Sequence, residues 1–160
     1  MPMDFVLGLH SHLPWVLHHG RWPHGTDWLC EAALDTYLPV FEKRTGIAIS
    51  FTKTGENRPV EREASVHVYR VLQEALNNVA KHARSAAAQV RLNLSPDLLV
   101  LEVEDSGSGF SGRRGQGMGL VSMRERAEIV GGQIEFLTGS TGGALVRLTV
   151  PTVREEAHAG

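Results

Sequence analysis

The first candidate for chemistry is a carboxylate at the end of an apolar run. Asp105 closes the sequence LLVLEVED and is followed by Gly107 and Gly109. A carboxylate in this place can accept a hydrogen bond from an exocyclic amine such as the N6 of adenine, and it would repel the carbonyl that guanine carries there. The two glycines allow the backbone to approach a flat ring closely and to adopt positive φ angles. A polar turn at the end of a strand is the alternative interpretation.

The second candidate is the glycine-rich sequence GQGMGL. Gly117 and Gly119 precede the start of a predicted helix, where free backbone N–H groups and the helix dipole favour an anion such as a phosphate. The sequence is not a Rossmann fingerprint, and it is not a Walker A motif because no Lys-Ser/Thr pair follows the glycines. Two glycines before a helix are a weak signal, so the order of the candidates along the chain is more informative than this motif alone.

The third candidate is a polar stripe within the amphipathic segment QEALNNVAKHA. Glu74, Asn78 and His82 are spaced four residues apart and would form a continuous stripe on a helix, with Lys81 beside it. Asn is a poor helix former because its short amide competes for backbone hydrogen bonds. Two consecutive asparagines, Asn77 and Asn78, beside a carboxylate and an imidazole therefore indicate more than a solvated helix face. The apolar stripe of the same helix consists of Leu72, Leu76, Val79 and Ala83.

Hydrophobic periodicity and turn residues predict the elements that must position these candidates. The expected helices span 26–44, with an interruption at Pro39 and a stop at Gly46, then 61–84 and about 120–130. The expected strands span 47–54, 88–95, 98–105, 133–139 and 144–151, with a turn at 55–59, a glycine-rich loop at 106–119 and a final hairpin through STGG. This order predicts an α+β fold, a two-layer sandwich with a mixed sheet and helices on one face.

The composition limits the class of protein. The chain has 160 residues, of which 42% are hydrophobic and 21% charged, enough for one globular domain with a core. Its formal net charge of −2 gives no basic field that would attract nucleic acid. The single cysteine excludes a disulfide framework and a cysteine-built zinc site. No apolar run could span a bilayer, so we expect a cytoplasmic chain, or a cytoplasmic part of a larger protein, without membrane contact.

Taken in order, the three candidates resemble a known family. EALNNVAKHA resembles the N box, DSGSGF the first glycine box and GMGLVSMRERAEIVGGQIEF the second glycine box of the catalytic ATP-binding domain of sensor histidine kinases, in the superfamily shared with gyrase, Hsp90 and MutL. FEKRTGIAISF and the MRER and GG pieces are most similar to the nitrate-sensor-like branch. The resemblance implies a Bergerat-type ATP-binding fold and an ATPase domain at 40–151, after a segment at 1–39 and before a tail at 152–160.

The resemblance also implies a role for each candidate residue. Asn78 resembles the Mg²⁺ ligand, because its amide oxygen is a hard neutral donor suited to an ion shared with phosphates. Glu74 resembles the carboxylate that polarises the incoming nucleophile or a metal-bound water. Lys81 and His82 could contact the phosphates, with a solvated lysine and a surface histidine as the alternatives. The ATP-binding set implied in this way is Asn78, Lys81, His82, Asp105, Gly107, Gly109, Gly117, Met118, Gly119 and Leu120.

The last hairpin departs from the family pattern. The branch often has Gly-Thr there, and the threonine hydroxyl supports the adenine-binding aspartate through a water. This chain has Gly143-Ala144 instead. Thr141 lies close by in the same turn, so the sequence alone leaves open which residue takes the place of the threonine. The departure points to a lowered affinity for nucleotide.

Residues 4–39 resemble a different family. Their sequence is similar to the amino terminus of α-glucan branching enzymes with a β/α barrel, in which LHSHLP forms the first barrel strand. The nucleophile and acid of that family lie far downstream, so we expect neither glycosidase activity nor an independent domain. A phosphoacceptor histidine in the Arg-x-x-His-Asp/Glu context of a dimerising helix is not found either.

One function and two alternatives follow from these implications. The expected function is Mg·ATP binding and transfer of the γ-phosphate to a histidine on a separate dimerisation domain, with a response regulator as further partner and a homodimer as a possible state. The expected enzyme is a protein histidine kinase that does not label itself when isolated. The alternatives are a serine kinase of the anti-sigma-factor type, against which MRERAEIVGG argues, and a non-catalytic ATP-binding module in a chimeric or truncated protein.

Overall fold

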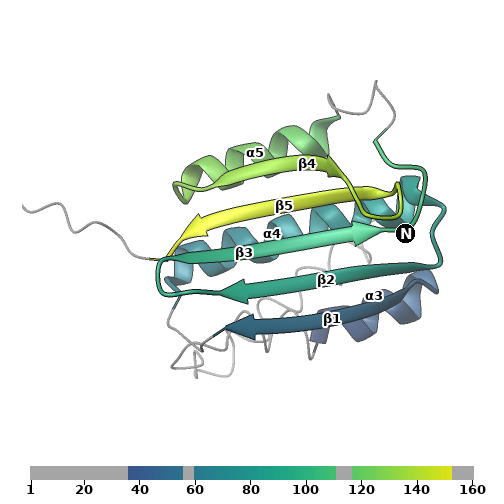
Figure 1. Ribbon diagram of the computed structural model, residues 1–160, viewed down its shortest axis with the longest axis horizontal. Helices are drawn as coiled ribbons and strands as arrows, with labels where there is room; N and C mark the ends of the chain where they lie inside the picture. Colours follow the sequence, from purple (N-terminus) through teal and green to yellow (C-terminus); the bar gives the residue numbers. More distant parts are fainter. Residues whose placement is uncertain (1–35, 56–59, 111–116, 153–160) are drawn as a thin grey trace, which may run out of the picture.

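The computed structural model describes residues 36–55, 60–110 and 117–152. Five strands form one mixed sheet in the order β1-β2-β3-β5-β4 (Figure 1). β1 pairs with β2 in parallel, and the other neighbours pair antiparallel, as predicted for a mixed sheet. The strands are β1 (Ala48–Gly55), β2 (Ala87–Leu94), β3 (Leu98–Asp105), β4 (Gln133–Thr138) and β5 (Ala144–Pro151).

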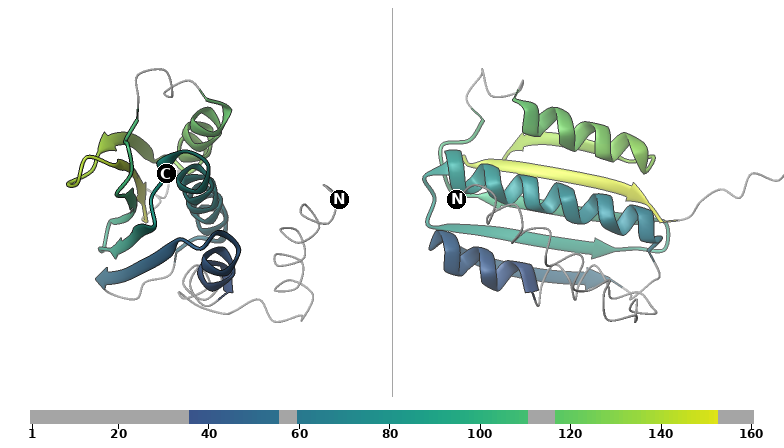
Figure 2. Two further views of the ribbon diagram at one scale, coloured as in Figure 1. Left: turned by 90° about the vertical axis from the view of Figure 1, so that its right-hand side faces the viewer. Right: turned by 180° about the vertical axis from the view of Figure 1, so that it is seen from behind.

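The helices of the described residues cover the same face of this sheet, which the left-hand view of Figure 2 shows edge-on. They are α3 (Leu38–Thr45), α4 (Arg62–Asn78), which continues directly into the π-helical turn η2 (Val79–Ala83), and α5 (Met118–Ile129). The predicted two-layer α+β sandwich is therefore confirmed. Among the described helices, none is both long and apolar enough to cross a membrane.

The core lies between the two layers and follows from the two periodicities of the sequence. Alternate residues of β2 and β3 point toward the helices and are buried, because side chains alternate across a strand. The apolar stripe of α4 and η2 meets them, and its four predicted positions are all buried. The largest side chains that are fully buried in this core are Phe41, Leu76, Leu99, Met123 and Leu148.

The first described helix places Pro39. It stands in the first turn of α3, directly after two π-helical residues, and a proline there costs no helical hydrogen bond, since the N–H groups of a first turn have no partner within the helix. The predicted interruption of a longer helix at Pro39 stays a prediction. Gly46 ends α3 as predicted, with φ at 72° and its N–H donating to the carbonyl of Glu42 at 2.8 Å. The predicted part of this helix before residue 36, the resemblance at 4–35, the turn at 56–59 and the tail beyond 152 lie outside the described residues.

The other helix boundaries fall close to the predictions, with one change of helix type. α5 begins two residues earlier than expected, because the carbonyl of Gly117 already accepts hydrogen bonds from the N–H groups of Leu120 and Val121. The helix predicted to run uniformly to residue 84 widens in its last turn into η2 and stops at Arg84, whose φ is 50°. This turn carries the Lys81 and His82 side chains.

The face of the sheet without helices carries a row of charges. Arg91, Glu102, Arg147 and Glu135 stand opposite one another on β2, β3, β5 and β4, so that the signs alternate across the sheet. The Nε atoms of both arginines lie 2.8 Å from carboxylate oxygens of Glu102. Pairs of opposite charge on neighbouring strands stabilise a sheet by about 0.2–1 kcal/mol each. This row leaves the open face polar, consistent with a sandwich of only two layers.

Candidate functional site

A cavity of about 390 Å³ lies between the end of α4, η2, the end of β3, the start of α5 and β5. Sites for small molecules typically enclose about 300–1,000 Å³, so the cavity is large enough for a nucleotide base and its neighbouring groups. Ten of the eleven predicted site residues line it, namely Glu74, Asn78, Lys81, His82, Asp105, Gly109, Gly117, Met118, Gly119 and Leu120. The fold thus brings together candidates that are up to 46 residues apart in the sequence, and their roles stay predictions.

The carboxylate of Asp105 forms one end of the cavity. It is the last residue of β3, only 4% of its surface is exposed, and it lies on the side of the strand that faces the helices. Its Oδ1 accepts hydrogen bonds from the N–H groups of Gly107 at 2.8 Å and Ala144 at 3.2 Å. Both of these bonds go to the same oxygen. The second oxygen therefore offers an acceptor that a ligand in the cavity can use.

Gly107 is the predicted site residue that does not line the cavity. A Cβ at this position would overlap the carbonyl oxygen of Ala83 at the end of η2. Its N–H donates to Asp105, as described above. The glycine therefore permits the turn after β3 to pack against η2 while its N–H holds the carboxylate, and its contact with nucleotide stays a prediction.

Ala144, and not Thr141, occupies the position beside Asp105. Ala144 lines the cavity and donates its N–H to the carboxylate. Thr141 is exposed in the turn between β4 and β5 and is not among the residues that line the cavity. The ambiguity in the sequence is resolved, and the cavity has a methyl group where a threonine would bring a hydroxyl.

The opposite end of the cavity combines polar side chains with a helix start. Glu74 and Asn78 are half-buried on α4, while Lys81 and His82 are exposed on η2. The carboxylate of Glu74 lies against the first turn of α5, because a Cβ at Gly119 would overlap its Oε1. The first turn of a helix has free N–H groups and the positive end of the helix dipole, which favour an anion. The carboxylate of Glu74, the amide of Asn78 and the side chains of Lys81 and His82 therefore adjoin a place that favours an anion.

The apolar walls of the cavity were missed by the sequence analysis. They consist of Ala75, Val79, Ala83, Val103, Phe110 and Val146. Four of them belong to the apolar stripe of α4 and η2 or to the inward positions of β3 and β5. From the sequence alone, such positions are assigned to the hydrophobic core and not to a binding site. Phe110 is held by an edge-on contact with Phe136, at 5.8 Å between ring centroids. The phenylalanine that ends DSGSGF was the available signal for this wall.

Comparison with known proteins identifies the family to which the chain belongs. Residues 63–154 match the family described as "Histidine kinase-, DNA gyrase B-, and HSP90-like ATPase". The chain is 36% identical over 124 residues to the oxygen sensor histidine kinase NreB of Staphylococcus carnosus (strain TM300). The aligned region covers 76% of this chain and 36% of that protein. The chain thus spans about a third of the length of this curated relative. These matches confirm the resemblance derived from the three motifs.

Similar solved structures agree with the fold. The Acinetobacter baumannii histidine kinase AdeS has a TM-score of 0.64 at 12% identity, over 95% of this chain and 81% of that chain. The histidine kinase domain from the Erythrobacter litoralis EL346 blue-light activated histidine kinase has a TM-score of 0.61 at 22% identity, over 79% and 60%. At these identities the likeness concerns the fold alone.

Proposed function

Because this chain belongs to the family of histidine kinase-, DNA gyrase B- and HSP90-like ATPases, we propose that it is the Mg·ATP-binding catalytic domain of a two-component sensor histidine kinase. In this proposal the ATPase domain spans residues 40–151, works in the cytoplasm and transfers the γ-phosphate to a histidine of a separate dimerisation domain. A response regulator is the further partner. The observation that supports the proposal most is the single cavity that joins a buried acceptor, the polar end of α4 and the start of α5.

Asp105 is the residue that we expect to recognise adenine. Its Oδ1 is occupied by two backbone N–H groups, which fixes the plane of the carboxylate and leaves Oδ2 for the amine of the base. Val103, Phe110 and Val146 supply apolar surface for the ring. Guanine would place a carbonyl against the same oxygen, so the site favours adenine.

The polar end of the cavity fits a magnesium ion and phosphates. Asn78 and Glu74 present an amide oxygen and a carboxylate, which are the hard donors that Mg²⁺ prefers, and Mg²⁺ is usually shared between one or two protein groups and phosphate oxygens. Asn78 would hold the ion, which when bound would offset the negative charge of the phosphates. Lys81, His82 and the first-turn N–H groups of α5 would contact the phosphates directly.

Transfer to the histidine needs little covalent help from the chain. The imidazole nitrogen of the partner would attack the γ-phosphorus, the bond to the bridging oxygen would break, and ADP would leave. In this proposal Glu74 would accept the proton that the imidazole loses. Catalysis by this chain is then mainly positioning and neutralisation of charge.

Titration with a fluorescent ATP analogue, with and without Mg²⁺, tests the proposal. We expect saturable binding that Mg²⁺ strengthens, and we expect Asn78→Ala to remove that strengthening. Asn77→Ala is the matched control, because Asn77 is the preceding residue of the same helix and does not line the cavity. The absence of binding, or an equal loss in both variants, would contradict the assignment.

A further inference from the structure

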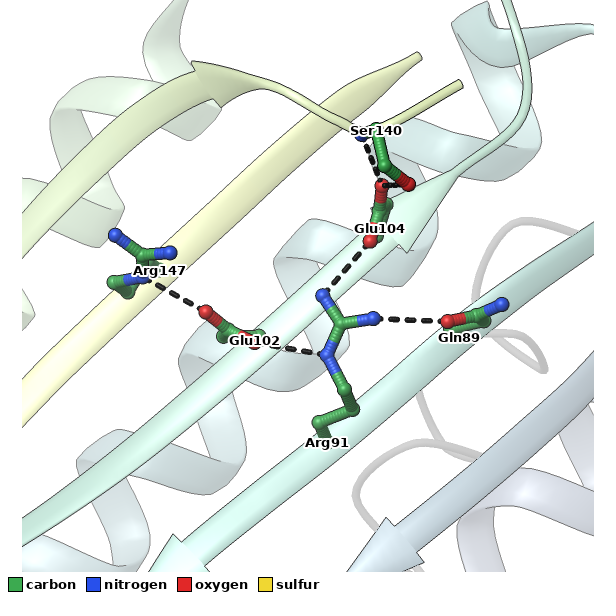
Figure 3. A network of polar contacts seen from close by, with 6 residues as sticks. All are labelled: Gln89, Arg91, Glu102, Glu104, Ser140 and Arg147. Carbon is green, nitrogen blue, oxygen red and sulfur yellow. Dashed lines mark hydrogen bonds and ion pairs between the residues drawn. The ribbon is translucent and has the colours of Figure 1, made fainter. Parts of the chain in front are cut away.

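Glu104 directly precedes Asp105 but points to the other face of the sheet. Because side chains alternate along a strand, Asp105 faces the cavity and Glu104 faces the helix-free side, where Figure 3 shows it beside Arg91 and Ser140. Only 8% of the residue is exposed, although it lies on the open face. It does not line the cavity.

Both carboxylate oxygens of Glu104 are occupied. Oε1 accepts hydrogen bonds from the backbone N–H of Ser140 at 2.7 Å and from the Ser140 hydroxyl at 3.0 Å. Oε2 lies 2.8 Å from Nη2 of Arg91, in an ion pair (Figure 3). The hydrogen bond from Arg91 holds the pKa of Glu104 below its ordinary value, against the effect of burial. The residue is therefore a charged anchor, tied to β2 on one side and to the turn between β4 and β5 on the other.

The turn that Glu104 holds is the one that reaches Asp105. The N–H of Gly139 donates to the carbonyl of Gly143 at 2.7 Å and closes the turn around Ser140. On its far side the N–H of Ala144 donates to Oδ1 of Asp105. Gly143 lies so close that an added Cβ would overlap the carbonyl oxygen of Asp105. One turn thus contacts the side chains of two consecutive residues on opposite faces of β3.

We propose that Glu104 is a positioning residue for the nucleotide, which holds the β4–β5 turn so that the Ala144 N–H keeps the Asp105 carboxylate in the orientation that binds adenine. This inference rests on the proposed function, since it assumes that Asp105 meets the base. Glu104 itself touches neither base nor phosphate. Its effect on binding must therefore pass through Asp105.

A double-mutant cycle isolates that connection. The full chain is compared with Glu104→Ala, Asp105→Asn and the double variant, and ATP affinity is measured by titration calorimetry. Glu102→Ala is the matched control, because Glu102 lies on the same face of β3 and is also bonded to Arg91, yet its other partner is Arg147 on β5 and not the turn. Glu104→Gln is a second variant, which keeps an oxygen for Ser140 and preserves the shape if the alanine variant does not fold.

The expected result is a loss of ATP affinity of roughly threefold to tenfold in Glu104→Ala, which corresponds to the usual net contribution of one or two hydrogen bonds. Glu102→Ala should leave the affinity unchanged, and Glu104→Gln should lie between Glu104→Ala and the unaltered chain. In the Asp105→Asn background, Glu104→Ala should have no further effect, because the acceptor oxygen that the turn positions for the ligand is already lost.

Two results would overturn the inference. Unchanged affinity in a folded Glu104→Ala or Glu104→Gln variant would refute it, and so would additive losses in the double variant, which indicate a general loosening of the fold. Failure of the proposed function is recognised separately, because Asp105→Asn alone would then leave ATP affinity unchanged.

Discussion

Replacing Asp105 by asparagine should weaken ATP binding without disturbing the fold. The carboxylate and the amide have the same shape, and two backbone N–H groups converge on Oδ1. These donors select the amide oxygen for the Oδ1 position, so the NH₂ group must take the place of Oδ2 in the cavity. There it would meet the N6 amine of adenine as donor against donor.

The magnitude follows from what is lost. A hydrogen bond to a charged group contributes about 1.5–3 kcal/mol, which corresponds to a rise in Kd of roughly tenfold to hundredfold. A 6-oxo base such as that of inosine triphosphate should instead gain affinity, because the new NH₂ donor faces its carbonyl. Calorimetric titration with ATP and with inosine triphosphate measures both changes. Asp97→Asn, at an exposed position in the turn between β2 and β3, makes the same substitution away from the cavity.

An unchanged Kd for ATP in Asp105→Asn would refute the adenine assignment. An equal loss of affinity for both nucleotides would also contradict the reasoning, since it would indicate that the substitution damaged the cavity as a whole and not one contact. Thermal unfolding of the two variants separates these cases.

Three further predictions concern the two ends of the cavity and its anchor. Glu74→Gln should leave ATP affinity nearly unchanged but slow phosphoryl transfer to a dimerisation domain added in trans, and a parallel loss of binding would show that the carboxylate acts on the nucleotide. Ala144→Thr, which places a hydroxyl beside Asp105, should raise ATP affinity by roughly threefold to tenfold in calorimetry, the worth of a hydrogen bond. Because the folded-state pKa of Glu104 is lowered, its carboxylate contributes stability above the unfolded value of about 4.3 and loses it as the pH falls through the lower folded value. The free energy of unfolding in urea should therefore differ most between the unaltered chain and Glu104→Gln near neutral pH, and a difference that stays constant down to pH 3 would contradict the charged state of Glu104.

Sequence periodicity predicted most of the fold because each element keeps one pattern throughout. The alternation in β2 and β3 and the apolar stripe of α4 each specify a buried face, and the sheet and helix layers follow from burying those faces together. The three motifs likewise predicted the cavity lining, since they supply the polar groups and the glycines. Pro39 fits either the start of α3 or a break in a longer helix, because proline breaks a helix interior and favours a helix start.

What escaped prediction depends on contacts between distant residues. Glu104 and Ser140 are 36 residues apart, and nothing in the local sequence of either indicates the other. The function of Gly107 depends on the approach of Ala83, which only the packed structure reveals. The widening of α4 into a π-helical turn also lacks a local signal, because VAKHA has an ordinary helical composition.

That π-helical turn makes the length of this segment less critical than the length of α4. A π-turn closes with hydrogen bonds from i to i+5, so it contains one residue more than the α-helical turn that could replace it. If one residue were deleted there, for example the exposed Ala80, an α-helical turn could close instead, and the residues after it would keep nearly the same direction about the helix axis. A deletion in the regular turn between Glu74 and Asn78 would instead rotate Asn78 by about 100° relative to Glu74. The segment between Asn78 and Arg84 should therefore tolerate the loss of one residue better than the segment between Glu74 and Asn78.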